Sequence, residues 1–182
     1  MRINEEIMEI KKCTEADIQP VTDFYDKTVK WLDEHINYPK WRYKIYPSLK
    51  YVKLMTEEGS QYMCIDQGKV VGAFVLNDNP HGAYEKGNWK KPLAPGTYLV
   101  LHTLATDSDM YRQGIGTEVI NFCIRKAKKE GYRAIRVDVV PDNDPAIRFY
   151  ERNGFTWAGD VDLELGIKAI PVFSLLELNL PE

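Results

Sequence analysis

The chain has 182 residues, of which 44% are hydrophobic and 28% charged, as is typical of a folded globular protein with a single domain over residues 1–182. The 24 basic and 27 acidic residues give a formal net charge of -3 and form no basic block, which argues against a nucleic-acid partner. No stretch approaches the roughly 18 consecutive apolar residues of a membrane helix, and the charged start does not resemble a signal peptide. A cytoplasmic protein without a membrane partner is expected.

The cysteines and histidines show no pattern of a metal site or a disulfide framework. Cys13, Cys64 and Cys123 are odd in number, widely spaced and without a CxxC pair. The three histidines have no HxxxH or HxH spacing that would bring two imidazoles to one metal ion. We therefore predict three reduced thiols and no bound metal.

The first part of the chain predicts a strand, two helices and an aromatic loop. Residues 6–12 alternate weakly and predict a strand, and Thr14 is placed to cap a helix that runs toward Trp31. Residues 31–51 are rich in tyrosine and tryptophan but are broken by two prolines, so a structured loop is expected. Residues 47–58 predict a short helix with Ser48 as its cap, ended by Gly59.

In the middle of the chain, the spacing of the apolar residues changes to one typical of β-strands. Residues 61–65 and 70–76 are short apolar runs joined by residues 66–69, which predicts an antiparallel hairpin. Residues 77–96 form a loop rich in proline and glycine, and loops of this length are often functional. The stretch 97–106 is apolar on both faces apart from His102, which predicts a strand in the middle of the sheet.

The last part predicts two helices and three strands. A helical stripe starts at Ile115 and ends before Gly131, and its apolar members are Ile115, Val119, Ile120, Cys123 and Ala127. A strand over 134–140 follows, then a short helix with Asp144 as cap and Pro145 as first residue, closed by Gly154. Strands over 155–158 and 172–178 complete an α+β arrangement with a mixed sheet.

Two glycines open the helix at Ile115, directly after a strand and a turn. Unpaired amides and the helix dipole at such a helix N-terminus suit a pyrophosphate group. A dinucleotide-binding fold uses the same physics, and Asp138 lies where that fold places its ribose-binding acid. However, 66 residues after Gly116 are too few for its remaining strands, and Val119 stands where its third glycine is expected.

A second motif lies between Asp138 and Phe155, in the sequence DVVPDNDPAIRFYERNGF. Together with LATDSDMYRQGIGTEVI it resembles the GNAT superfamily of N-acetyltransferases, whose cofactor motif is Q/R-x-x-G-x-G/A and whose next motif is approximately N-x-x-A-x-x-F/L-Y-x-x-x-G-F. The resemblance covers residues 99–155 directly. It implies an acyl-CoA N-acyltransferase fold, in which a mostly antiparallel central sheet with splayed middle strands is flanked by helices.

The resemblance also implies acetyl-CoA or coenzyme A as co-substrate and a set of residues that bind it. Backbone of Leu104, Ala105 and Thr106 would pair with the pantetheine arm in the gap between the middle strands. The pyrophosphate would lie on the turn formed by Arg112, Gln113, Gly114, Ile115, Gly116 and Thr117, and the remaining implied contacts are Asn143, Ala146 and Tyr150. One departure is Tyr111, which stands where the family has Gln or Arg, so we expect cofactor affinity to be tuned and not abolished.

The same resemblance assigns catalytic roles. Tyr150 would be the acid that protonates the leaving thiolate, and the amide near Leu104 would polarise the thioester carbonyl. His102 is the candidate base, because an alkylamine with a pKa of about 10.4 has to lose a proton before it attacks. Asp138, Glu85 and a water relay remain open as alternatives for the base.

The acceptor is expected to be an amine of a small molecule or a short peptide. The aromatic segment 31–51 and the loop with Tyr84, Glu85 and Trp89 occupy the places where family members build the acceptor site, and their rings and carboxylates suit a cation. The alternatives are a non-catalytic acyl-CoA binding or sensor module and a nucleotide-binding protein. The sequence does not identify the oligomeric state; a homodimer is one candidate, because dimers are common in the superfamily.

Overall fold

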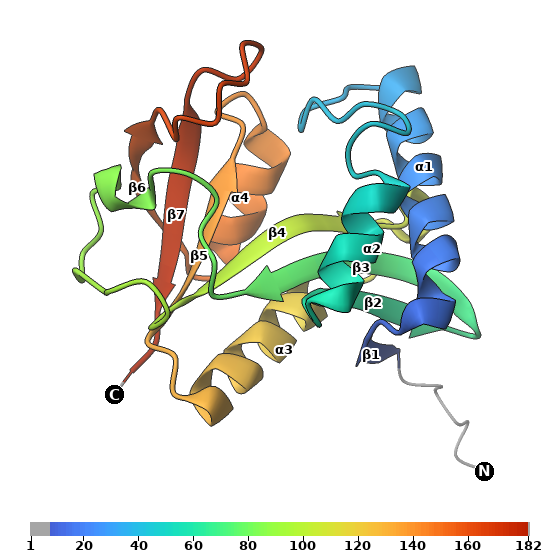
Figure 1. Ribbon diagram of the computed structural model, residues 1–182, viewed down its shortest axis with the longest axis horizontal. Coiled ribbons are helices and arrows are strands. Elements are labelled where there is room, and N and C mark those ends of the chain that lie inside the picture. Colours follow the sequence, from blue (N-terminus) through green and yellow to red (C-terminus); the bar gives the residue numbers. More distant parts are fainter. Residues whose placement is uncertain (1–7, 182) are drawn as a thin grey trace. The chain divides into compact units, whose positions relative to one another are not determined.

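The structure, a computed structural model, describes residues 8–181 and contains a seven-stranded sheet with four α-helices (Figure 1). In chain order the elements are β1 (Glu9–Lys12), α1 (Ile18–Glu34), α2 (Leu49–Glu57), β2 (Gln61–Asp66), β3 (Lys69–Asn77), β4 (Leu99–Thr106), α3 (Ile115–Glu130), β5 (Ala134–Val139), α4 (Asp144–Arg152), β6 (Thr156–Val161) and β7 (Phe173–Asn179). Three single turns of 3-10 helix are η1 (Glu15–Asp17), η2 (Tyr84–Lys86) and η3 (Ser108–Met110). Of the predicted first strand, residues 6 and 7 lie outside the described residues. Over residues 8–181, no helix is both long and apolar enough to cross a membrane.

The strands are hydrogen-bonded in the order β1-β2-β3-β4-β5-β7-β6. The pairs β1–β2, β2–β3, β5–β7 and β6–β7 are antiparallel, whereas β4–β5 is parallel. The strand after the long loop, β4, is fourth of the seven, which confirms the prediction that it is the middle strand. The mixed, mostly antiparallel sheet confirms the predicted α+β class.

The chain divides into two compact units. The first unit comprises the residues up to 37, with residues 41–75 and 103–119. The second unit comprises residues 38–40, 76–102 and the chain from 120 onward. Strand β4 passes from the second unit to the first between His102 and Thr103.

The first unit contains the helix pair α1 and α2, the hairpin of β2 and β3, and their common core. The two helices pack against each other, as Figure 1 shows. The hairpin turns at Gln67 and Gly68, whose φ values of 46° and 75° are both in the left-handed region that a tight two-residue hairpin requires. The buried residues that meet in the core are Cys13, Val21, Phe24, Tyr25, Val52, Met63, Ala73 and Ala105.

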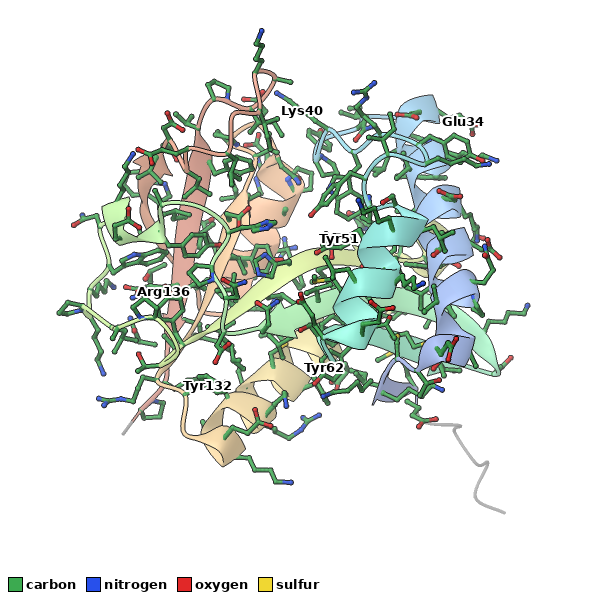
Figure 2. The ribbon with its side chains drawn as sticks, viewed as in Figure 1. Glu34, Lys40, Tyr51, Tyr62, Tyr132 and Arg136 are labelled. Carbon is green, nitrogen blue, oxygen red and sulfur yellow. The ribbon has the colours of Figure 1, made fainter. Side chains whose placement is uncertain are left out.

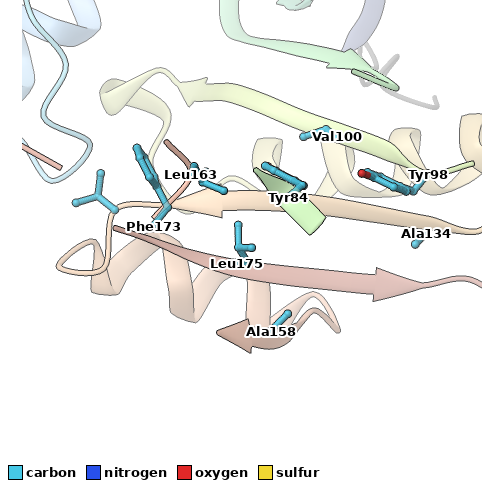
Figure 3. Packing of buried hydrophobic residues seen from close by; sticks show 9 residues of the cluster. Tyr84, Tyr98, Val100, Ala134, Ala158, Leu163, Phe173 and Leu175 are labelled. Carbon is cyan, nitrogen blue, oxygen red and sulfur yellow. The ribbon is translucent and has the colours of Figure 1, made fainter. Parts of the chain in front are cut away.

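The second unit has its own core, formed where the long loop and the last strands pack on β5 (Figure 3). Strand β7 lies between β5 and β6 and supplies Phe173 and Leu175 to this core. The buried residues that meet there are Tyr84, Tyr98, Val100, Ala134, Val140, Ala158, Leu163, Phe173 and Leu175. The predicted stripe of α3 is buried as expected, and Cys123 lies on it.

Some predicted boundaries were wrong by a few residues, for local reasons. Thr14 caps the 3-10 turn η1 and not α1 directly, since its N–H and hydroxyl both donate to the Asp17 carboxylate at 2.8 Å. The cap of α4 is Asn143, one residue before the predicted Asp144, because the Asn143 side chain accepts the Ala146 N–H at 3.2 Å.

Candidate functional site

The parallel ladder between β4 and β5 is short. It pairs Leu99 with Ile135 and Val100 with Arg136, and within the second unit no further pair follows, although β4 continues to His102 and β5 to Val139. Within the second unit, β4 and β5 are therefore not paired beyond Val100. This is where the family resemblance implies that the middle strands part.

The glycine turn before α3 lies in the first unit and has the geometry of an anion-binding turn. Arg112 and Gly114 have φ values of 67° and 82°, and a Cβ built on Gly114 meets nothing within 4 Å. The first helical bond runs from the Glu118 N–H to the Gly114 carbonyl at 3.0 Å. The N–H groups of Ile115, Gly116 and Thr117 precede it and lie outside the helical ladder, where they are available to an anion.

The residues just before this turn are held by carboxylates. The Asp107 side chain accepts the Asp109 N–H at 2.9 Å, and the Lys27 ammonium from α1 lies 3.1 Å from a carboxylate oxygen of each aspartate. These hydrogen bonds raise the pKa of Lys27. Tyr111 is 69% exposed, and its ring lies 5.7 Å from the Arg112 guanidinium. Tyr111, which stands where the family has Gln or Arg, is thus a solvent-facing side chain.

The end of β4 carries the backbone that the resemblance assigns to the pantetheine arm. Ala105 is buried, and Leu104 and Thr106 are half-buried. Before them, Thr103 has a φ of 48°, in the left-handed region. Its carbonyl accepts a hydrogen bond from the hydroxyl of Tyr25 in α1 at 2.9 Å. The sequence offered no signal for this contact, which joins residues 78 apart in the chain.

His102 lies in the second unit, half-buried at the end of that unit's part of β4. The His81 ring from the long loop meets it edge-on, with 5.9 Å between the ring centroids. Burial lowers the pKa of His102 below its ordinary value, and the nearby His81 lowers it further. The Asp138 carboxylate and the backbone of Asn79 act in the opposite direction. The net result is a lowered pKa, which favours the neutral imidazole.

Asp138 on β5 accepts a hydrogen bond from the Tyr84 hydroxyl, with 2.5 Å between the oxygens. Tyr84 is buried, and burial together with the Asp138 charge raises its pKa well above 10. The phenol therefore keeps its proton and acts as a donor. Tyr84 was predicted only as part of an acceptor site. The neighbouring Glu85, an alternative for the base, is exposed on η2.

Tyr150 lies on α4 in the second unit and is 7% exposed. Its ring packs against Phe149 and Phe155, with centroid separations of 5.2 Å. Burial raises the pKa of the phenol, and so do the nearby Cys123 and Asp138. Within residues 8–181 no hydrogen bond engages its hydroxyl, which leaves that group available to a bound molecule.

The long loop of residues 77–96 is fixed to the sheet through Arg136 of β5, which is labelled in Figure 2. The guanidinium lies between two rings, 3.9 Å from the centroid of Trp89 and 4.0 Å from that of Tyr98. It donates to the Lys91 carbonyl at 3.0 Å and lies 3.8 Å from the Glu177 carboxylate. The loop that carries His81 and Tyr84 is therefore an ordered part of the second unit.

The predicted aromatic segment contributes to an open cavity of about 570 Å³ in the first unit. Trp31 and Tyr43 line it together with the carboxylates of Asp23, Asp26 and Glu34. Of the lysines that also line it, Lys27 is paired with Asp107 and Asp109, and Lys30 lies 4.7 Å over the Tyr43 ring. The Asp78 carboxylate of the long loop belongs to the second unit and accepts a hydrogen bond from the Tyr132 hydroxyl at 3.1 Å.

In the second unit, the Asp138 carboxylate acts on the pKa values of both His102 and Tyr150, and Asn143 caps α4, the helix that carries Tyr150. The first unit holds the backbone positions 104–106 and 112–117. Sequence reasoning missed Tyr25 and Arg136 altogether.

Comparisons with known proteins agree with the resemblance. Residues 19–155 match the sequence profile of the Acetyltransferase (GNAT) family. An uncharacterized N-acetyltransferase of Methanocaldococcus jannaschii is 31% identical over 146 residues, which are 80% of this chain and 59% of that protein. The chain thus spans about three fifths of the length of that relative.

Solved structures show the same fold at low sequence identity. A GNAT-family acetyltransferase of Listeria monocytogenes matches with a TM-score of 0.73 at 18% identity, over 95% of each chain. One from Streptococcus agalactiae matches with a TM-score of 0.73 at 16% identity, over 97% of this chain and 98% of that one. A structure from Salmonella typhimurium solved with acetyl-CoA matches with a TM-score of 0.66 at 17% identity, over 97% and 96% of the two chains. The sheet and helices described above therefore form the α+β fold of these acetyltransferases.

Proposed function

Because the chain belongs to the acetyltransferase (GNAT) family, we propose that it is an N-acetyltransferase that transfers the acetyl group of acetyl-CoA to a primary amine of a small molecule or peptide. The family match over residues 19–155 carries this proposal. The attack is direct, in a ternary complex, and releases coenzyme A as a free thiol. The amine nitrogen forms a bond to the acetyl carbon, the carbon–sulfur bond breaks, and the amine proton has to leave.

Backbone groups of the first unit would hold acetyl-CoA. The N–H groups of Ile115, Gly116 and Thr117 would bind the pyrophosphate, and the open space at Gly114 supports such an approach. Leu104, Ala105 and Thr106 would pair with the pantetheine arm, with Asn143 and Ala146 of the second unit as further contacts. The co-substrate supplies an activated thioester, and the Leu104 N–H would stabilise the charge that develops on its carbonyl oxygen.

His102 would remove the amine proton. Its lowered pKa supports this role, because a base has to be unprotonated at the working pH. Asp138 would stabilise the imidazolium that forms, since its carboxylate already favours the charged ring. Its hydrogen bond from Tyr84 makes Asp138 a less accessible proton acceptor than His102. Between Asp138 and His102, this hydrogen bond therefore favours His102 as the base.

Tyr150 would donate to the leaving thiolate. A phenol with a raised pKa keeps its proton at neutral pH, so it can donate a hydrogen bond to the sulfur as negative charge develops there. Its hydroxyl has no other partner among the residues described. The transfer is completed when the sulfur, with an ordinary thiol pKa of about 8.5, takes up a proton from solvent and His102 returns the amine proton to solvent.

A cationic amine is the acceptor class that the first unit supports best. The cavity there combines the Trp31 ring with the carboxylates of Asp23, Asp26 and Glu34, whereas Lys30 and Lys44 lie over the Tyr43 ring. An ammonium group is attracted by both aromatic faces and carboxylates.

The proposal is tested by mixing the protein with acetyl-CoA and a panel of amines while free thiol is measured. We expect thiol release that depends on the amine and falls about hundredfold in Tyr150→Phe, the usual range for loss of an acid–base group. Tyr132→Phe is the matched control, because it also removes a tyrosine hydroxyl of the second unit, one that donates to Asp78. Binding of acetyl-CoA without release on any amine would instead favour a binding or sensor module. A melting temperature raised by NAD and not by CoA would favour a nucleotide-binding protein.

A further inference from the structure

Thr103 holds a backbone conformation that its side chain disfavours. Its φ is 48°, within a strand whose other residues, 99–102 and 104–106, have no positive φ. A β-branched residue occupies the left-handed region only where the surrounding structure enforces it, and such residues concentrate at functional positions. A neighbouring group therefore has to hold Thr103 in this conformation.

The Tyr25 hydroxyl is the group that holds Thr103 in this conformation. Its hydroxyl donates to the Thr103 carbonyl at 2.9 Å and lies 3.3 Å from the Thr103 hydroxyl. The Tyr25 side chain is fully buried, and its ring meets Trp41 edge-on at 6.0 Å. The Gln61 amide donates to the Tyr25 oxygen at 3.5 Å and to the Phe74 carbonyl at 3.0 Å. The phenol is thus fixed by α1 on one side and by β2 on the other.

The direction of this bond determines where the next amide points. The Thr103 carbonyl and the Leu104 N–H belong to one peptide unit, and in a trans peptide these two groups point in opposite directions. Because the carbonyl is bound on the side of Tyr25, the Leu104 N–H is directed away from Tyr25. This N–H is the group that the proposed function assigns to the thioester oxygen.

We propose that Tyr25 is a positioning residue of acetyl transfer, which fixes the Thr103–Leu104 peptide so that the Leu104 N–H is aimed at the thioester carbonyl. This inference rests on the proposed function. Tyr25 touches neither the acetyl group nor the amine in this role. Burial raises the pKa of its phenol, so the hydroxyl remains a donor across the working range of pH.

The first test is Tyr25→Phe, which keeps the ring and removes the donor. Without the bond, Thr103 relaxes toward an ordinary φ and the amide turns away. We expect kcat to fall about tenfold, part of the roughly hundredfold loss that removal of an oxyanion donor causes. The pH optimum stays unchanged, because Tyr25 does not titrate in this range. The Kd of coenzyme A, which has no carbonyl at this position, changes less than that of acetyl-CoA.

A second variant distinguishes positioning from general damage. Glycine adopts a φ of 48° without strain, so Thr103→Gly removes the tendency of this peptide to relax. We expect the double variant Tyr25→Phe/Thr103→Gly to recover part of the kcat that Tyr25→Phe loses. If Tyr25→Phe does not fold, Gln61→Met weakens the same arrangement and is expected to lower kcat in the same direction by a smaller factor.

The amide itself gives a readout that does not need turnover. In ¹⁵N-labelled protein, the Leu104 N–H signal should differ between the complexes with acetyl-CoA and with coenzyme A, and this difference should shrink in Tyr25→Phe. A kcat within twofold of the wild type, with an unchanged Kd ratio and amide signal, overturns the inference. A wild-type protein that binds acetyl-CoA but transfers nothing overturns the proposed function, while the Kd ratio and the amide signal still decide the role of Tyr25.

Discussion

The two units hold different kinds of candidate residue. The first unit contributes backbone: the peptide after Thr103 and the N–H groups of residues 115–117. The second contributes the side chains of His102, Tyr84 and Tyr150, whose pKa values are each shifted in part by the Asp138 carboxylate. Substitutions in the first should therefore matter mainly through backbone conformation, and those in the second through the chemistry of the group removed.

The largest effect is expected in the second unit, at His102. In His102→Gln the amine has no base, and kcat/KM should fall by about a hundredfold or more. Steady-state rates at pH 7 measure this loss, with His35→Gln as control, because His35 is exposed and stacks on Trp31. A loss below about fivefold would contradict the role of His102 and return the assignment to Asp138, Glu85 or a water relay.

A smaller effect is expected in the first unit, at Gly114. With its φ of 82°, alanine there costs roughly 1–2 kcal/mol, so the free turn relaxes and coenzyme A has to restore it, which corresponds to about a tenfold weaker binding. Tyr111→Gln, three residues earlier, restores the family's usual residue on an exposed side chain and should change the Kd less than twofold. Calorimetry measures both values. A larger effect at Tyr111 than at Gly114 would show that side chains, and not backbone, control this turn.

The smallest effects are shifts of the pH profile, and they have opposite signs. The Asp138 charge favours protonated His102, so Asp138→Asn should lower the pKa of His102 further and move the acid limb of kcat/KM to lower pH. His81 disfavours the protonated ring, so His81→Asn should raise that pKa and move the limb to higher pH. Each shift is expected to be about half a unit, or roughly threefold in rate on the limb. Shifts in the same direction would refute this electrostatic arrangement.

Sequence periodicity predicted the elements well where local patterns determine them. The hairpin at Gln67 and Gly68, the buried stripe of α3 and the middle position of β4 are confirmed. The start of α1 was missed because Thr14 caps the 3-10 turn η1, and the cap of α4 because two neighbouring polar residues, Asn143 and Asp144, compete for it. The family motifs, and not the periodicity, identified the fold and the candidate residues.

The contacts that shape the candidate site could not be predicted in this way. Tyr84 and Asp138 are 54 residues apart, and Tyr25 and Thr103 are 78 apart. Nothing in the composition of either segment indicates its partner. The positive φ of Thr103 runs against the preference of its own side chain, so local propensity predicts an ordinary strand there.

The contacts of the Arg136 guanidinium with Trp89, Tyr98 and Lys91 determine how the long loop of the second unit opens. A long loop rich in proline and glycine is ordinarily among the first parts of a fold to open. Opening this loop would separate the guanidinium from the rings of Trp89 and Tyr98 and leave the Glu177 carboxylate without the Lys90 N–H that it accepts at 2.7 Å. The loop and the strand beneath it are thus coupled into one cooperative unit, and its amide hydrogens should exchange together with those of β5 and not before them.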